Sequence, residues 1–297
     1  FTKRAFMNGR IDLTQAEAII DIIEAKTEDS LSLAVAQLDG TVSSFVKDVR
    51  EQLIAMIAHL EVTIDYPEED IEDVTSQEVR EQLQPILKAM DELLSTANTG
   101  RLIRDGITTV IVGRPNAGKS SLMNALLREN RAIVTDIPGT TRDSIEEYMT
   151  VEGISLRLID TAGIRDTQDT VEALGVERAR DYINKADIVL CVIDGSTPLT
   201  PEEIEILTSV SGLNTIVLLN KSDVAQVVTD ENIKEHGTFT AIERISAKEG
   251  EGSAVLSKWV QELVYGGRVK QDNSAMISNV RHISLMEQAK AQVEQAL

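Results

Sequence analysis

The nine residues "GRPNAGKSS", at positions 113–121, decide the fold of this 297-residue chain. They match the pattern G-x-x-x-x-G-K-[ST], and an apolar run, "ITTVIVG", precedes them while a helical pattern follows, which is the context that the motif requires. In such a loop the backbone amides wrap phosphates, the lysine reaches the terminal oxygens and the serine hydroxyl ligates magnesium. The expected nucleotide contacts here are Asn116, Ala117, Gly118, Lys119, Ser120 and Ser121, with Ser120 as a magnesium ligand.

Three later motifs complete the predicted nucleotide site, and the last two of them identify the base. "DTAG" begins at Asp160, at a strand end where its carboxylate can hold the metal shell, and "NKSD" (220–223) follows another strand. Asp223 can accept both donor groups on the Watson–Crick edge of guanine, whereas adenine offers the opposite pattern, and "SAK" (246–248) suits a backbone donor to the guanine oxygen. The motifs therefore predict a guanine nucleotide. The expected contacts are Asp160, Thr161, Ala162, Gly163, Asn220, Lys221, Asp223, Ser246, Ala247 and Lys248.

The stretch "TDIPGTTRD" (135–143) lies between the first two motifs and is interpreted as a first switch, with the loop after Asp160 as the second. Thr141 is the preferred second magnesium ligand over Thr140. The expected nucleotide contacts in this stretch are Thr135, Asp136, Ile137, Pro138, Gly139, Thr140 and Thr141.

The second switch lacks the usual group for orienting the attacking water. Ile164 stands where many GTPases keep a glutamine, and an isoleucine cannot hold water. Spacing alone does not distinguish Asp166, Asp169 and Glu172 as its substitute.

Outside these motifs, two kinds of pattern predict two kinds of domain. From Ile107 onward short apolar strands alternate with helical stretches, which is typical of a mostly parallel sheet covered by helices, and "EEYMTVEGISLRLID" predicts one antiparallel pair. We expect an α/β P-loop GTPase domain, with a six-stranded sheet containing one antiparallel strand, inserted into an all-α helical domain. The expected boundaries are 1–13 for the end of a preceding domain, 14–105 and 269–297 for the helical domain, and 106–268 for the GTPase domain.

The helical segments carry their own start signals. Thr14 with Glu17, and Thr75 with Glu78, have the spacing of capping boxes. Apolar residues recur at three-and-four spacing from Leu31 to residue 64, which predicts one helix of about nine turns that Gly40 does not interrupt. Pro85 should kink the next helix.

Composition excludes several classes of function. The formal charge of −20 repels phosphate backbones, so tight direct RNA binding is disfavoured. No apolar run is long enough to span a membrane, and the chain starts without a signal-peptide core, so a cytoplasmic location is expected. The single cysteine, Cys191, sits in an apolar run and excludes a disulfide or zinc cluster within this chain; it is expected in the core.

The motif series, together with "FTKRAFMNGRIDLTQAEAIIDII" and "DYPEEDI", resembles the MnmE (TrmE) family, GTPases of wobble-uridine modification in tRNA. The resemblance implies dimerising GTPase domains and an MnmG-type FAD-dependent partner that forms a heterotetramer with the homodimer and supplies most tRNA contact. It also implies that this chain lacks the family's N-terminal folate-binding domain and C-terminal Cys-x-Gly-Lys motif. Arg10 aligns with a folate-contacting position, and folate is expected to bind only the full-length protein.

The resemblance also answers the question that Ile164 raises. It implies a potassium ion beside the phosphates in place of an arginine finger, with Asn116, Thr135, Thr140 and the backbone carbonyl of Ile137 as ligands. It points to Glu172, twelve residues beyond Asp160, as the residue that orients the water, acting through a bridging water.

Two other functions stay open. A ribosome-assembly GTPase would need an RNA-binding appendage, and no basic or aromatic-rich module occurs. A nucleotide-dependent scaffold that binds GTP without useful hydrolysis is suggested by Ile164.

Overall fold

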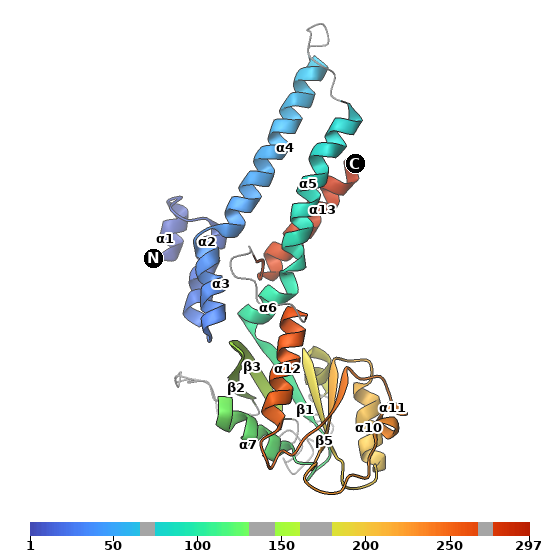
Figure 1. The fold of residues 1–297 in the computed structure, drawn as a ribbon. Coiled ribbons are helices and arrows are strands. Elements are labelled where there is room, and N and C mark those ends of the chain that lie inside the picture. Colours follow the sequence, from blue (N-terminus) through green and yellow to red (C-terminus); the bar gives the residue numbers. More distant parts are fainter. Residues whose placement is uncertain (66–74, 131–145, 161–179, 267–275) are drawn as a thin grey trace, which may run out of the picture. The chain divides into compact units, whose positions relative to one another are not determined.

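The computed structural model describes residues 1–65, 75–130, 146–160, 180–266 and 276–297. The chain divides into two compact units. The first, called the helical unit below, comprises Phe1–Asp105 and Val269–Leu297, and the second, the sheet unit, comprises Gly106–Arg268. The fold class predicted from the sequence is confirmed, because a mostly parallel sheet unit is inserted into an all-helical one (Figure 1).

The sheet unit contains a six-stranded sheet in the order β2-β3-β1-β4-β5-β6. Only the β2–β3 pair is antiparallel, as the sequence predicts, and its turn places Glu152 (φ 53°) and Gly153 (φ 79°) in the left-handed region. All other described pairs are parallel, so the carboxyl ends of β1, β3, β4 and β5 lie at one edge. The strands are β1 Ile107–Val112, β2 Glu146–Val151, β3 Ile154–Asp160, β4 Ile188–Asp194, β5 Thr215–Asn220 and β6 Ala241–Arg244.

Helices of the sheet unit cover a densely apolar sheet, in which every residue of β4 and β5 is buried. Thr200 caps α10, with Glu203 closing a capping box and Pro201 in the first turn. Cys191 is fully buried, which confirms its core placement, and burial raises the pKa of its thiol to about 12. The helices are α7 Lys119–Asn130, α10 Pro201–Val210, α11 Asp230–Lys234 and α12 Gly252–Tyr265.

The helical unit contains a core made by α4, α5 and α13, of which α5 and α13 run side by side (Figure 1). The helices are α1 Thr2–Met7, α2 Leu13–Glu24, α3 Glu28–Leu38, α4 Thr41–Asp65, α5 Ser76–Ser95, α6 Ala97–Asp105 and α13 Val280–Gln295. Thr75 and Glu78 form the capping box predicted for α5, which continues as a helix through Pro85. The buried core residues are Met56, Leu83, Ile86, Met90, Leu93, Ile277 and Met286.

Two predictions about the helical unit are wrong. The first predicted helix starts earlier, because Asp12 and Gln15 form the capping box of α2 in place of Thr14 and Glu17. The predicted nine-turn helix is two helices, since Gly40 adopts φ +88° between α3 and α4. A left-handed residue ends an α-helix, so the apolar spacing continues across Gly40 while the backbone does not.

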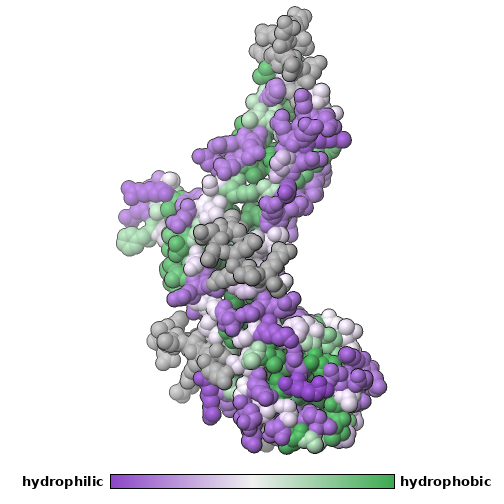
Figure 2. All heavy atoms as spheres, in the orientation of Figure 1, coloured by the Kyte–Doolittle hydropathy of each residue, from purple (hydrophilic) through white to green (hydrophobic). Residues whose placement is uncertain are grey.

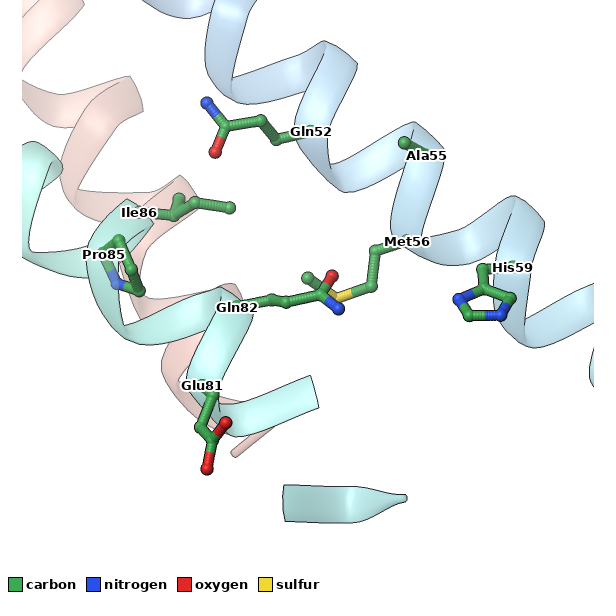
Figure 3. A pocket seen from close by; sticks show the side chains of 8 residues that line it. All are labelled: Gln52, Ala55, Met56, His59, Glu81, Gln82, Pro85 and Ile86. Carbon is green, nitrogen blue, oxygen red and sulfur yellow. The ribbon is translucent and has the colours of Figure 1, made fainter. Parts of the chain in front are cut away.

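The helical unit also has a groove between α4 and α5, with a volume of about 580 Å³, and the core residues Met56 and Ile86 contribute to its lining. Figure 3 shows Met56 from α4 and Gln82 from α5 extending into the space between the two helices. The surface is a mixture of polar and apolar residues, with hydrophilic residues spread widely over the visible face (Figure 2). Within the described ranges, we find no helix that combines the length and the apolar character needed to cross a bilayer.

Candidate functional site

The segment "GRPNAGKSS" (113–121), called the phosphate loop below, lies between a strand and a helix as the sequence predicts, since β1 ends at Val112 and α7 starts at Lys119. Lys119 is only 6% exposed, and its Nζ donates to the carbonyl oxygens of Gly113 and Arg114, both at 2.8 Å. The lysine side chain is therefore buried and held in place by two carbonyl groups of the loop. Because α7 begins here, the amides of its first turn, which have no acceptor four residues back within the helix, can bind a phosphate group.

Two loop residues adopt the left-handed conformation, Asn116 with φ 64° and Gly118 with φ 104°. Gly118 is required for space as well as for conformation, because a Cβ there would overlap the Nδ2 of Asn220. Asn116 is exposed, so its side-chain amide is accessible to a ligand, and Ser120 is exposed in the first turn of α7.

Asn220, the last residue of β5, connects three of the predicted motifs. Its side-chain Nδ2 donates to the carbonyl oxygen of Ala117 at 2.8 Å, and its Oδ1 accepts from the backbone amide of Ala247 at 3.0 Å. The residue is 3% exposed, so both bonds are shielded from water. The phosphate loop, the "NKSD" turn and the "SAK" loop are thereby brought together at one edge of the sheet.

The loop that follows β6 is tied to the "NKSD" turn. Ser246 Oγ donates to Asp223 Oδ1 at 3.0 Å, and Lys248 Nζ lies 4.0 Å from Asp223 Oδ2. The Ser246 amide donates to Glu251 Oε2 at 2.8 Å, and the same oxygen accepts from Ser222 Oγ at 3.1 Å. Glu251 is therefore a member of the site that sequence reasoning missed, since its only signal is its place two residues after Glu249 in "SAKEGEG".

A further cluster that sequence reasoning missed surrounds Asp194, the last residue of β4. Its Oδ2 lies 2.6 Å from Lys221 Nζ and 3.5 Å from a terminal nitrogen of Arg114. Arg114 also donates through Nε to Glu203, which is fully buried, at 2.8 Å. Burial pushes the pKa of Asp194 upward, but hydrogen bonds from Lys221 and Ser196 outweigh that effect and hold the pKa below its usual value. The carboxylate is therefore ionised at neutral pH.

Part of the predicted site falls outside the described residues. Asp160 is the last residue of β3, but the structure describes only its backbone. Arg10 is exposed after α1, and its amide donates to the carbonyl of Ala5. The predicted residues outside the described ranges are Thr135, Asp136, Ile137, Pro138, Gly139, Thr140, Thr141, Thr161, Ala162, Gly163 and Glu172.

Comparison with known proteins relates the whole chain to one family. The MnmE helical domain profile matches residues 13–297. The chain is 48% identical over its full length to the tRNA modification GTPase MnmE of Geobacillus thermodenitrificans, and 47% identical to that of Clostridioides difficile. It spans 64% and 65% of the lengths of these two relatives.

Among solved structures, Era of Aquifex aeolicus bound to GDP·AlF4⁻ is 28% identical to the aligned part of this chain. The alignment covers 59% of this chain and 62% of Era, with a TM-score of 0.39.

Proposed function

This chain belongs to the MnmE helical domain family, and we propose that it is the GTP-binding and GTP-hydrolysing portion of a tRNA modification GTPase. The observation that carries the proposal is the Asn220 side chain, which joins the phosphate loop at Ala117 to the base-binding loop at Ala247. A nucleotide needs both loops at once, because one holds its phosphates and the other its base. The curated relatives carry the same function in their names.

Guanine specificity rests on Asp223 in this proposal. Its carboxylate accepts from the guanine amino group and ring N–H, and Ser246 holds one of its oxygens in place at 3.0 Å. The "SAK" loop supplies a backbone donor to the guanine oxygen. Adenine would not offer Asp223 this pair of donors, and each polar group that the base covers without pairing costs about 1–3 kcal/mol.

The metal sites are proposed on the chemistry of the available ligands. The exposed Ser120 hydroxyl fits a magnesium ligand, with Thr141 as the second hydroxyl. The exposed Asn116 fits an oxygen ligand for potassium, together with Thr135, Thr140 and the Ile137 carbonyl. A potassium ion bound there supplies positive charge next to the phosphates, where it favours departure of the leaving phosphate oxygen.

Glu172 is the proposed residue for orienting the attacking water, in place of the glutamine that Ile164 replaces. For the complete protein we propose a cytoplasmic homodimer whose GTPase domains associate through the switches. It works with an MnmG-type FAD-dependent partner that supplies most of the tRNA contact, since this chain carries a formal charge of −20. A folate one-carbon donor belongs to the full-length protein, with Arg10 as its contact in this chain.

Titration of the chain with fluorescent GDP and ADP analogues tests the binding half of the proposal. We expect GDP to bind much more tightly than ADP, and Asp223→Asn to shift preference toward xanthosine nucleotides. Equal affinity of the wild-type chain for GDP and ADP would contradict the guanine assignment.

Hydrolysis of GTP in potassium and in sodium buffers tests the catalytic half. We expect faster turnover in potassium, weakened potassium dependence in Asn116→Ala, and turnover reduced roughly 10²-fold or more in Glu172→Ala at unchanged GDP affinity. If Glu172→Ala is fully active while Asp166→Ala or Asp169→Ala is inactive, the water is held by a nearer carboxylate.

A further inference from the structure

Three charged residues form a chain across the nucleotide edge of the sheet, and we call Lys221, Asp194 and Arg114 the Asp194 bridge. The Asp194 side chain is only 5% exposed, whereas Lys221 and Arg114 are 40% and 24% exposed. Its Oδ2 faces both cations, at 2.6 Å from Lys221 and 3.5 Å from Arg114. Its Oδ1 accepts from the amide and the hydroxyl of Ser196 at 3.0 and 2.6 Å, so the carboxylate has a fixed orientation.

Each cation of the bridge belongs to a different nucleotide motif. Arg114 is the second residue of the phosphate loop, and Lys221 is the second residue of "NKSD". Glu203 is a second, fully buried anchor for Arg114 at 2.8 Å. Lys221 has Asp194 as its carboxylate partner in the described part of the chain, so loss of the Asp194 charge falls mainly on Lys221.

The backbone around Lys221 is held as firmly as its side chain. Lys221 adopts φ 66°, a left-handed conformation that a non-glycine residue keeps only when its surroundings enforce it. The Gln226 Nε2 donates to the Lys221 carbonyl at 2.7 Å, and the Gly195 amide donates to the Asn220 carbonyl at 3.0 Å. The turns after β4 and β5 are thus bonded to each other, and Asp194 extends that connection to the lysine ammonium.

We propose that Asp194 is a positioning residue of the guanine-nucleotide site. It holds the Lys221 ammonium, so that the lysine stem stays in place against the guanine base. Through Arg114, it also links Lys221 to the phosphate loop. The proposal rests on the proposed function, since it requires a guanine nucleotide at this edge. A lysine stem is apolar over its four methylene groups and covers a flat base well when its charged end is fixed elsewhere. Without Asp194, binding must immobilise a partly exposed lysine, and a charge-assisted hydrogen bond is lost.

The test is a double-mutant cycle on the affinity of the chain for fluorescent GDP. Asp194→Asn removes the charge, and Lys221→Met removes the ammonium but keeps a stem of similar length. Because Asp194 acts through Lys221, we expect each single variant to weaken binding about tenfold, the scale of one charge-assisted hydrogen bond, and the double variant to be no weaker than either. A residue with a merely structural role would give additive losses, about a hundredfold in the double variant.

Asp230→Asn is the matched control, because Asp230 also pairs with an arginine of the sheet unit, Arg244, but on the surface. It should bind GDP as the wild type does. Wild-type affinity in Asp194→Asn, or additive losses in the double variant, overturns the proposal while leaving the proposed function intact. If Asp194→Asn does not fold, Lys221→Met can still overturn the proposal, since wild-type affinity in that variant excludes a role for the ammonium that Asp194 holds. A wild-type chain that binds no GDP overturns the proposed function and this inference with it.

Discussion

Asn220→Ala removes the side chain that connects the phosphate loop to the "SAK" loop. Two buried backbone groups then lose their partners, the Ala117 carbonyl and the Ala247 amide. Each unpaired buried group costs about 1–3 kcal/mol, so we expect the sheet unit to lose about 2–6 kcal/mol of unfolding free energy. That is a large fraction of the 5–15 kcal/mol typical of a folded domain.

Urea unfolding monitored by tryptophan fluorescence measures this loss in the sheet unit. The chain has one tryptophan, Trp259, which lies on α12 and donates to Glu243 at 3.2 Å. Its emission therefore reports the sheet unit even though the chain has two units. Binding of fluorescent GDP at low urea gives the second readout, and the affinity of Asn220→Ala for GDP should be strongly reduced.

Asn214 offers a matched control at the opposite end of the same strand, directly before β5. Its amide also makes two bonds, to the Asp187 carbonyl at 2.7 Å and from the Thr240 hydroxyl at 2.9 Å, but it is only partly buried. Asn214→Ala should lower stability less than Asn220→Ala and leave GDP affinity unchanged. The reasoning is refuted if Asn220→Ala unfolds like the wild type, or if the two variants lose GDP affinity equally.

Three further experiments test single features. Gly118→Ala should abolish GDP binding, because the added Cβ overlaps the Asn220 side chain. The control is Gly212→Ala, which is also at positive φ (+78°) but has open space around it. This control should lose only about 1 kcal/mol of unfolding free energy in urea and bind GDP normally. Cys191 should resist thiol reagents at pH 8 until urea unfolds the sheet unit, because burial raises its pKa to about 12; rapid labelling of native protein would contradict this. Burial and the nearby Arg281 charge lower the pKa of His282 below its usual 6.5, although the Glu17 carboxylate lies 3.0 Å away. Below about pH 6.5 the unfolded chain therefore binds more protons than the folded chain, and the stability of the folded chain should fall. Circular dichroism melts of wild type and His282→Gln check this, and identical pH dependence would refute it.

Local signals in the sequence predicted some helix starts correctly and others wrongly, and tertiary contacts explain the difference. Thr75 and Glu78 form their box, in which the glutamate carboxylate accepts from the amide and the hydroxyl of Thr75. Glu17 instead binds Arg281 at 2.9 Å, 264 residues away, and Asp12 caps α2 while also accepting from Ser43. A four-residue pattern cannot anticipate such partners.

The same limit applies to the candidate site. Glycine spacing and carboxylate chemistry restrict which residues work in the phosphate loop and in "NKSD", so the sequence could single out these two segments, and the structure brings them together. The links between the motifs were not predictable, because Asp194 and Lys221 meet across adjacent strands, and Arg114 occupies a position that the motif leaves unspecified. The prediction of one long helix across Gly40 failed for a different reason, since apolar spacing indicates which face of a helix is buried but not the sign of φ at a residue.

The two units differ in whether their core residues come from one stretch of the chain or from both sides of the insertion. The buried residues of one core cluster of the sheet unit all lie between Val110 and Ile233, within the insertion. The helical core requires Met90 of α5 and Met286 of α13, which lie on opposite sides of the insertion. Thr96 accepts from the Ile277 amide at 3.1 Å, and Gln37 donates to Ser278 at 2.6 Å, so the polar contacts span the same interval. Because loop closure costs more entropy as the loop lengthens, a sheet unit that folds first shortens the effective loop and favours closure of the helical core.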